Sequence, residues 1–351
     1  MGKTIKDVAV AAGVSTATVS RVLAPENPVV VREATRARVM TAAEELGFRV
    51  NYAARSLKLQ ATMTIGVVFP ELANEFFLDV AKGIEREIHK SGYTMLLSSS
   101  RNSLEEEKRR ISMLAERMVD GILIVPAGAQ GGHLAEISQQ GMPMIMVDRI
   151  AEGTGLEAVV SDNEEGAFSL TQALLADGYR RIAFVGGQRG ISSAQERLNG
   201  YLNAMLQAQI SPPASWICRG GMDVEDGYSL LAGLLKKKNP PDAAVAVNIL
   251  VHLGMERCLL EMRGQAPPLV IAGFDKALYS PFLPACRYTA SQDAVGMGEK
   301  AGSRIVEKIR EKKEGSAESI KNGGGKNAEK VIRLPVIISR AACGTAINGG
   351  K

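Results

Sequence analysis

Two groups of side chains in this sequence have the types and spacing needed for molecular recognition. The first lies in the segment TATVSRV near the N-terminus, and if that segment is helical its outward residues are Thr16, Ala17, Ser20 and Arg21. An arginine can donate two parallel hydrogen bonds to guanine, and an alanine methyl can contact the methyl group of thymine. Thr18 and Arg36 suit phosphate contacts, which position a protein on DNA without reading its sequence. This end of the chain is therefore predicted to read DNA.

The second group consists of polar and aromatic side chains that follow the β-strands predicted further along. They are Asn74, Phe76, Phe77, Asp148, Arg149, Arg197, Asn248, Asp275 and Gln292. Carboxylates accept hydrogen bonds from hydroxyls, amides donate and accept, and arginine donates a planar fork, so the set suits a polyol whose apolar face a phenylalanine could cover. Alternatives remain open: Asp148 and Asp275 could cap the helices after them, Arg149 could pair with an acid, and Phe77 could belong to the core.

Three short helices are predicted to position the first group. Apolar residues recur with helical spacing from Ile5 to Ala12, and Thr4 with Asp7 can cap that helix. Gly13 stands where a left-handed helix exit is needed, and Ser15 can cap the second helix. An amphipathic stretch over residues 33–46 closes a small core. This pattern predicts a helix-turn-helix, whose second helix enters the major groove.

The charge distribution agrees with a polyanion-binding head. Residues 1–60 contain nine Lys and Arg side chains against five acids, and this excess of four equals the net charge of the whole 351-residue chain. A basic head on a neutral remainder indicates a nucleic-acid-binding module joined to another domain.

From residue 64 onward, short β-rich runs alternate with amphipathic stretches of helical length, which predicts βαβ units and parallel sheets. Nearly 300 residues of this pattern exceed one such sheet, so two lobes are expected, with the chain crossing between them near 161–163 and 291–293. The carboxyl ends of the strands then face a cleft that holds the second group of side chains. Residues 314–329 are glycine-rich and polar, which predicts a flexible insertion. Residues 331–338 are predicted to form one edge strand, because Pro335 lies inside it.

The segments TIKDVAVAAGVSTATVSRVL, TRARVMTAAEELGF and NYAARSLKLQATMTIGVVFP closely resemble the lactose-repressor (LacI) family of bacterial transcription regulators, and the likeness continues through nearly the whole chain. The resemblance implies a DNA-binding repressor whose operator affinity is controlled allosterically by a small effector, often a sugar. It further implies a homodimer on a pseudo-palindromic operator in the cytoplasm. The last dozen residues carry no leucine heptad, so the tetramerising coil of some members is not expected.

The resemblance also implies a hinge helix over Asn51–Lys58 that folds only when two protomers meet on the operator. Asn51 and Lys58 would contact DNA there, and Leu57 would be wedged into a base step of the minor groove. Eight residues are too few for a stable isolated helix, so pairing and DNA must stabilise it. An apolar wedge between bases kinks the duplex.

The expected organisation is a helix-turn-helix domain followed by two Rossmann-like lobes. The predicted boundaries are 1–50 for the DNA-binding domain, 51–62 for the hinge, 63–161 with 293–326 for the first lobe, 162–292 with 327–341 for the second lobe, and 342–351 for a tail. Asp148, Arg197, Asn248 and Asp275 match effector-binding positions of the family. Two departures bear on the effector: Ile249 replaces a frequent aspartate, and Met222 replaces a frequent aromatic residue, which weakens the case for a purine.

Two other classes of protein fit the sequence less well. An enzyme with a DNA-binding appendage, such as a sugar kinase or an NAD-linked dehydrogenase, is disfavoured because the three histidines have no metal-ligand spacing and no nucleophile or dinucleotide motif is present. A solute-binding protein would share the two-lobed body, but this sequence has a helix-turn-helix and no visible signal peptide. Four scattered cysteines and no long apolar run argue against disulfides, a zinc cluster and a membrane span. No cofactor is expected, and the sequence leaves open which effector binds and whether it induces or co-represses.

Overall fold

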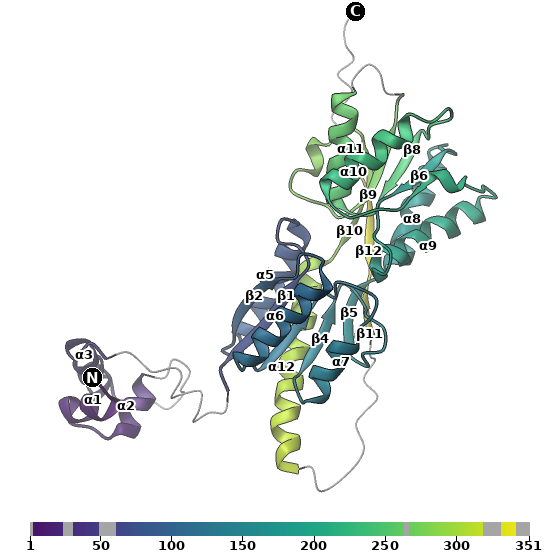
Figure 1. Ribbon diagram of the computed structural model, residues 1–351. Helices are drawn as coiled ribbons and strands as arrows, with labels where there is room; N and C mark the ends of the chain where they lie inside the picture. Colours follow the sequence, from purple (N-terminus) through teal and green to yellow (C-terminus); the bar gives the residue numbers. More distant parts are fainter. Residues whose placement is uncertain (1–2, 24–30, 49–60, 263–266, 319–330, 342–351) are drawn as a thin grey trace, which may run out of the picture. The chain divides into compact units, whose positions relative to one another are not determined.

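The computed structural model describes residues 3–23, 31–48, 61–262, 267–318 and 331–341. It consists of two compact units (Figure 1), residues 1–63 and residues 64–351, which we call the head and the body. Each is described by itself. The predicted hinge, Asn51–Lys58 with Leu57, and the tail at 342–351 lie outside the described residues.

The head is a three-helix unit built as the sequence predicts. Its helices are α1 (Ile5–Ala12), α2 (Thr16–Val22) and α3 (Glu33–Glu45). Thr4 and Asp7 form a capping box on α1, and Gly13 ends that helix with φ of 63°, a left-handed conformation that glycine adopts without strain. Val8, Val19 and Val39, one from each helix, are fully buried together. This core holds α2 with one side facing outward.

The first lobe of the body is a parallel six-stranded sheet in the order β11-β5-β4-β3-β1-β2. The strands are β1 (Thr64–Phe69), β2 (Thr94–Ser99), β3 (Gly121–Ile124), β4 (Met144–Val147), β5 (Glu157–Ser161) and β11 (Val331–Leu334). Its helices are α5 (Glu75–His89), α6 (Leu104–Glu116), α7 (Gly132–Gln139) and α12 (Ala294–Glu318). Helices α5 and α12 pack together on one face, and α6 and α7 cover the other. A sheet covered on both faces explains the uninterrupted apolar strands.

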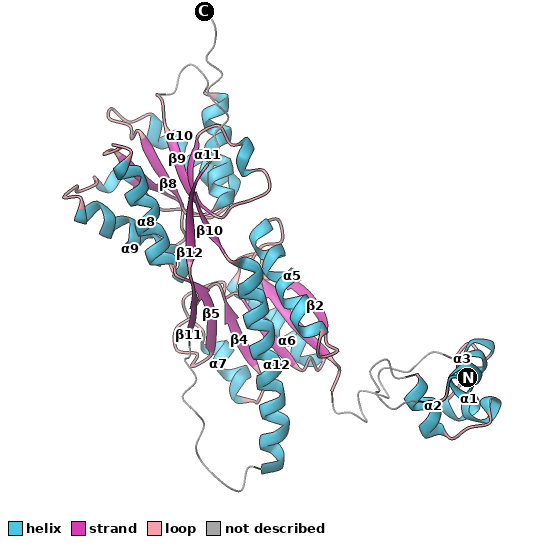
Figure 2. Cartoon of the chain, turned by 180° about the vertical axis from the view of Figure 1, so that it is seen from behind, coloured by secondary structure: helices cyan, strands magenta, loops and turns pink. Residues whose placement is uncertain are grey.

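The second lobe is a six-stranded sheet in the order β12-β10-β9-β8-β6-β7, parallel except for β12. The strands are β6 (Ile182–Val185), β7 (Ile217–Cys218), β8 (Ala243–Ala246), β9 (Val270–Phe274), β10 (Cys286–Gln292) and β12 (Val336–Arg340). Its helices are α8 (Asn163–Ala176), α9 (Ser192–Gln207), α10 (Val224–Leu235) and α11 (Ile249–Glu261), with short 3-10 turns at Ala214–Trp216 and Ser280–Phe282. Figure 2 shows helices on both sides of each sheet.

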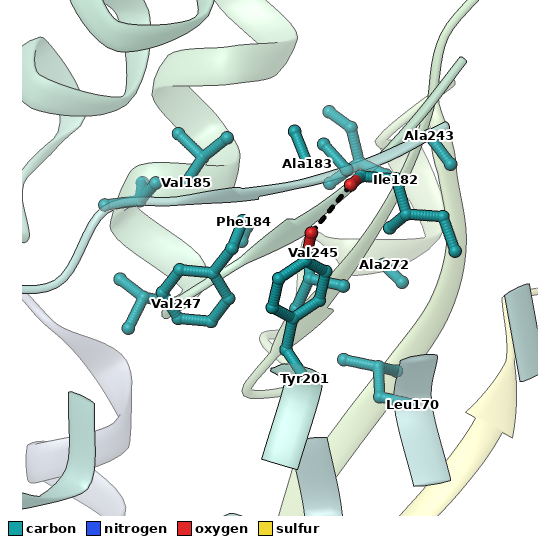
Figure 3. Packing of buried hydrophobic residues seen from close by; sticks show 14 of the residues in the cluster. Leu170, Ile182, Ala183, Phe184, Val185, Tyr201, Ala243, Val245, Val247 and Ala272 are labelled. Atoms are coloured by element: carbon teal, nitrogen blue, oxygen red, sulfur yellow. Dashed lines mark hydrogen bonds between the residues drawn. The ribbon is translucent and has the colours of Figure 1, made fainter. Parts of the chain in front are cut away.

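The core of the second lobe is dense and includes one buried hydroxyl. Figure 3 shows Tyr201 of α9 among side chains from β6, β8 and α8. Its hydroxyl donates a hydrogen bond to the carbonyl oxygen of Ile182 at 2.8 Å, and its ring lies 5.6 Å from that of Phe184. The partner for the hydroxyl removes the penalty of burying a polar group.

The chain passes between the lobes three times, after β5, after β10 and between β11 and β12. The crossings after β5 and β10 occur where the sequence predicts them. The single strand predicted over 331–338 is wrong: β11 pairs with β5 in the first sheet and β12 pairs with β10 in the second. Pro335, which separates them, has no N–H to continue a ladder. Residues 331–334 therefore belong to the first lobe, which corrects the boundary predicted at 327.

The insertion predicted over 314–329 also begins later than expected. Helix α12 continues to Glu318 in spite of Gly315, and residues 319–330 lie outside the described part of the chain. A run of Glu, Lys and Arg favours helix strongly enough to carry α12 into the polar segment.

The helix pairs cross where glycines allow close approach. A Cβ atom added at Gly227 of α10 would lie 2.1 Å from the carbonyl oxygen of Val251 in α11. Similar crossings occur at Gly200, between α9 and α8, and at Gly83, between α5 and α12. Gly233, also in α10, has nothing within 4 Å of such an atom.

We expect Gly227→Ala to lower the free energy of unfolding by about 1–3 kcal/mol, because backbone must move to admit the methyl group. Gly233→Ala in the same helix is the control, and it should raise stability by about 0.5–1 kcal/mol because alanine favours helix. Urea denaturation measures both. Equal effects of the two substitutions would contradict the close crossing.

Candidate functional site

The outward side of α2 carries the residues predicted to read DNA. Thr16, Ala17, Ser20 and Arg21 are exposed, whereas Val19 and Val22 are buried. The hydroxyl of Ser15 accepts a hydrogen bond from the Thr18 backbone N–H at 3.2 Å and also lies 2.9 Å from the Thr18 hydroxyl. Arg36 is exposed on α3. Asn51, Leu57 and Lys58 lie outside the described residues, so their DNA contacts stay predictions.

In the body, the two lobes present an aspartate at corresponding places. Asp148 follows β4 and Asp275 follows β9, with φ of 62° and 70°. The backbone N–H of each donates to a carbonyl of the neighbouring strand: Asp148 to Val159 at 2.9 Å and Asp275 to Ala290 at 3.0 Å. Aspartate is among the few residues that tolerate this left-handed conformation. Neither residue caps a helix, so the alternative role as helix caps does not apply.

Asp148 and Arg149 form a buried and incompletely hydrogen-bonded pair. The Arg149 Nε atom lies 3.7 Å from Asp148 Oδ2, and both side chains are nearly inaccessible. Asp148 Oδ1 and Arg149 Nε are buried without a hydrogen-bond partner. Burial raises the pKa of Asp148 to about 6, although the nearby charges of Arg149 and Arg197 act in the opposite direction. Such a pair is costly to maintain in an empty protein.

Two loops of the first lobe, after β2 and after β3, hold Arg149. Its Nη1 atom donates to Asn102 Oδ1 at 2.9 Å and to the carbonyl oxygen of Pro126 at 3.3 Å. The loop after Pro126 is fixed in turn by buried Glu107, whose carboxylate accepts from the backbone N–H of Ala127 at 2.6 Å and lies 2.7 Å from His133 Nε2. Nothing in the sequence indicates these supporting residues, because they are far apart in the chain and only the fold brings them together.

Arg197 occupies the same buried region from the second lobe. Its Nε donates to Asn163 Oδ1 at 2.8 Å, its Nη1 donates to the carbonyl oxygen of Val247 at 2.7 Å, and its guanidinium lies 3.9 Å from the centre of the Phe274 ring. Burial lowers the pKa of Arg197, while Asp275 and Asp148 raise it. Fixed in this way, Arg197 brings a positive charge close to both aspartates.

Asp275 and Gln292 border a small cavity of about 40 Å³ whose lining comes from both lobes. The lining residues are Glu75, Phe76, Asp79, Ile249, Asp275, Lys276, Ala277, Gln292 and Ala294. The Gln292 amide donates to Asp275, and its Oε1 atom is buried without a partner. Burial raises the pKa of Asp275 against the opposing effect of Arg197.

Other predicted residues make contacts that stabilise the fold itself. Asn74 accepts from the Phe76 N–H and caps α5. Asn248 caps α11 through Val251 and donates to the carbonyl oxygen of Met222 at 2.9 Å. The Phe77 ring stacks 5.4 Å from that of Phe69, which agrees with the core alternative. Whether these residues also touch an effector stays a prediction.

The lobes also meet through contacts that the sequence did not suggest. The backbone N–H of Ile150 donates to Ser192 Oγ at 2.8 Å, and the N–H of Leu278 donates to Glu75 Oε2 at 3.1 Å. Arg333 pairs with Glu196 at 3.1 Å. These contacts place parts of the two lobes directly against each other.

The described ranges of the chain contain neither a candidate metal site nor a candidate membrane-spanning helix. No group of three or more His, Cys, Asp or Glu side chains there could hold a metal ion. No helix within them is long and apolar enough to cross a membrane.

Comparisons with known proteins agree with this two-part design. The family described as "Bacterial regulatory proteins, lacI family" matches residues 4–51, and "Periplasmic binding proteins and sugar binding domain of LacI family" matches residues 62–322. The HTH-type transcriptional repressor PurR of Aliivibrio salmonicida is 30% identical over 311 residues, which cover 88% of this chain and 93% of PurR.

Solved structures show the same architecture. The Lac repressor dimer bound to operator and the anti-inducer ONPF matches with a TM-score of 0.79 and 24% identity, covering 98% of this chain and 99% of that one. The complex of the transcriptional regulator CelR with cellobiose matches with a TM-score of 0.69 and 25% identity, covering 96% and 99%.

A helix-turn-helix head joined to a two-lobed periplasmic-binding-protein-like body defines a class of effector-controlled DNA-binding transcription regulators. This chain belongs to the LacI family of that class. The predicted fold class is confirmed, and so is the prediction of a DNA-binding repressor rather than an enzyme.

The raised pKa of Asp148 predicts a stability effect with a defined sign. The folded body retains a proton that the unfolded chain releases between about pH 4 and pH 6, so this group makes the fold less stable as pH rises through that window. Asp148→Asn keeps the shape without the charge. It should be more stable than the wild type by up to about 3 kcal/mol at pH 7.5, with the difference vanishing toward pH 4.

Thermal melts of both proteins across that pH range measure the difference in stability between them. Because all other groups titrate in both proteins, their contributions cancel in this difference. Parallel profiles for the two proteins would show that Asp148 is not strained by its burial.

Proposed function

We propose that this regulator binds a small polyol, a sugar or a sugar derivative, between the two lobes of its body. The observation that carries the proposal is a set of three buried atoms without partners: Asp148 Oδ1, Arg149 Nε and Gln292 Oε1. Two of them accept hydrogen bonds and one donates. A hydroxyl group both donates and accepts, so adjacent hydroxyls of one ligand can satisfy all three. The cellobiose bound by the similar regulator CelR is a ligand of this chemistry.

Each lobe supplies part of the proposed site. Asp148 and Arg149 come from the first lobe, Arg197 and Asp275 from the second, and Gln292 from the strand that crosses between them. Phe76 borders the cavity beside Asp275 and offers a ring to the apolar face of a sugar. Asn74, Phe77, Met222 and Asn248 are proposed to contribute further contacts to the effector. A ligand that contacts both lobes favours their closed arrangement.

Closure is the proposed signal to the DNA-binding head. A ligand shifts an equilibrium only as far as its affinity differs between the two states. Contacts such as Ile150 with Ser192 and Glu75 with Leu278 belong to a closed arrangement, which the ligand would strengthen. The response is induction if closure separates the hinge segments of two protomers, and co-repression if it brings them together.

The active form is proposed to be a homodimer on a pseudo-palindromic operator, in the cytoplasm where the operator is found. Two helix-turn-helix heads then read two half-sites. Arg21, Ala17, Thr16 and Ser20 would contact bases, and Thr18 and Arg36 would contact phosphates. Asn51, Leu57 and Lys58 would contact the central minor groove once the paired hinges fold.

The effector site is tested by measuring operator affinity in the presence of a sugar panel that includes cellobiose, lactose, glucose and ribose. We expect at least one sugar to change operator affinity 5-fold or more, a typical allosteric coupling. Asp148→Asn should remove that response and leave operator affinity without sugar unchanged. The control, Asp79→Asn, changes an aspartate on the cavity rim that already pairs with Lys82 at 2.7 Å. A full response in Asp148→Asn would place the site elsewhere.

The DNA contacts are tested by comparing Arg21→Ala with Arg36→Ala. Arg21→Ala should weaken operator binding by about 1–3 kcal/mol and leave binding to random DNA nearly unchanged, because a base contact is lost. Arg36→Ala should weaken both equally and reduce the salt dependence by about one ion. Gel-shift titrations at several salt concentrations measure these effects. If Arg21→Ala instead weakened binding to operator and to random DNA equally, Arg21 would contact phosphates rather than bases.

A further inference from the structure

Arg219 lies directly after β7, at one end of the second lobe's sheet. Strand β7 is the edge strand opposite the crossing strands β10 and β12. Two hydrogen bonds tie the segment after Arg219 to neighbouring strand ends: the Gly187 N–H donates to the carbonyl oxygen of Gly221, and the Asn248 amide donates to that of Met222. Arg219 therefore belongs to the same end of the sheet as Asn248 and Asp275, where the effector site is proposed.

The guanidinium of Arg219 is only partly satisfied. Its Nη1 atom donates to Gln195 Oε1 at 2.9 Å, and its Nε makes a long contact of 3.5 Å with the carbonyl oxygen of Gly187. The Nη2 atom is buried and has no hydrogen-bond partner. Both partners are neutral, and among the described residues no carboxylate forms an ion pair with Arg219.

Two other arginines of the lobe do have a counter-ion. Arg257 is paired with Glu225 at 2.7 Å, and Arg287 with Asp177 at 2.6 Å. Near Arg219 the charge with the largest effect is the positive Arg189, and this repulsion together with burial lowers the pKa of the Arg219 guanidinium. A partly buried guanidinium beside a second cation is stabilised when an anion accepts its free N–H groups.

We propose that Arg219, with Arg189, forms an anion subsite at the outer end of the effector cleft, so that the effector carries a phosphate or carboxylate group. This inference rests on the proposed function, because it extends the same cleft. Strand β7 is three strands from β9, about 14 Å at the usual spacing. The aspartates would bind hydroxyls at one end, and Arg219 would bind the anion at the other. A phosphorylated sugar or a sugar acid has this polarity.

The direct test uses inorganic phosphate and the full-length protein. Thermal melts are compared in sodium phosphate and in sodium chloride of equal ionic strength. Bound phosphate stabilises the folded state by mass action. We expect a higher Tm in phosphate for the wild type and at least a 10-fold weaker phosphate affinity, by calorimetry, for Arg219→Gln. Arg181→Gln is the control: this exposed arginine lies at the amino end of β6 and already pairs with Asp242 at 3.2 Å. The DNA-binding head is identical in the wild type and both variants, so any phosphate bound by the head contributes equally to all three measurements.

A second comparison uses matched ligands: glucose with glucose 6-phosphate, and ribose with ribose 5-phosphate. We expect a phosphorylated member to bind at least 10-fold more tightly than its neutral counterpart, and Arg219→Gln to remove that preference. The inference is overturned if phosphate acts no differently from chloride, or if its effect survives in Arg219→Gln. If the anion subsite is overturned in this way but neutral sugars still change operator affinity, the proposed polyol site stands. Phosphate binding lost with Arg219, without any sugar effect on operator affinity, would refute the polyol site alone.

Discussion

The two lobes depend on charges that are buried between them without complete partners. Asp148 and Arg149 from one lobe and Arg197 and Asp275 from the other are all nearly inaccessible, yet hydrogen bonds satisfy only some of their atoms. An isolated buried charge is among the most costly features in a protein, and mutual attraction recovers only part of the cost. These buried polar atoms without partners are the ones that the hydroxyl groups of the proposed effector would satisfy.

The surrounding structure keeps these charges in place in spite of that cost. Asp148 and Asp275 take left-handed backbone conformations, each anchored by a hydrogen bond to the adjacent strand. Arg149 is held by loops after β2 and β3, and Arg197 by Asn163 and the end of β8. In the proposed effector site, this fixed placement would reduce the conformational entropy lost on binding, because the side chains are already ordered.

Much of this organisation could be predicted from sequence, because it follows from local periodicity. The capping box at Thr4, the left-handed Gly13 and the strands of the body all express short-range patterns. The expectation that polar side chains follow the carboxyl ends of the strands also placed Asp148 and Asp275 directly after a strand, as the structure has them. The same reasoning misplaced residues 331–334, because a proline within an apolar run reads as one edge strand, whereas pairing partners more than 150 residues away decide the sheet. It could not identify Glu107, His133 or Ser192, whose contacts arise only when distant segments meet.

The division of the C-terminal strand pair between the sheets has a consequence for how this protein assembles. Because β11 completes one sheet and β12 the other, neither sheet is made from one uninterrupted stretch of polypeptide. Both edge strands lie near residue 335, so neither lobe can complete its sheet until the ribosome has synthesised the chain to that point. The two lobes are therefore expected to finish folding at the same stage. If a protease cleaved one of the three connections, the other two would still join the lobes covalently. A fragment expressed as residues 64–161 or 182–292 alone would lack the edge strand that β11 or β12 supplies.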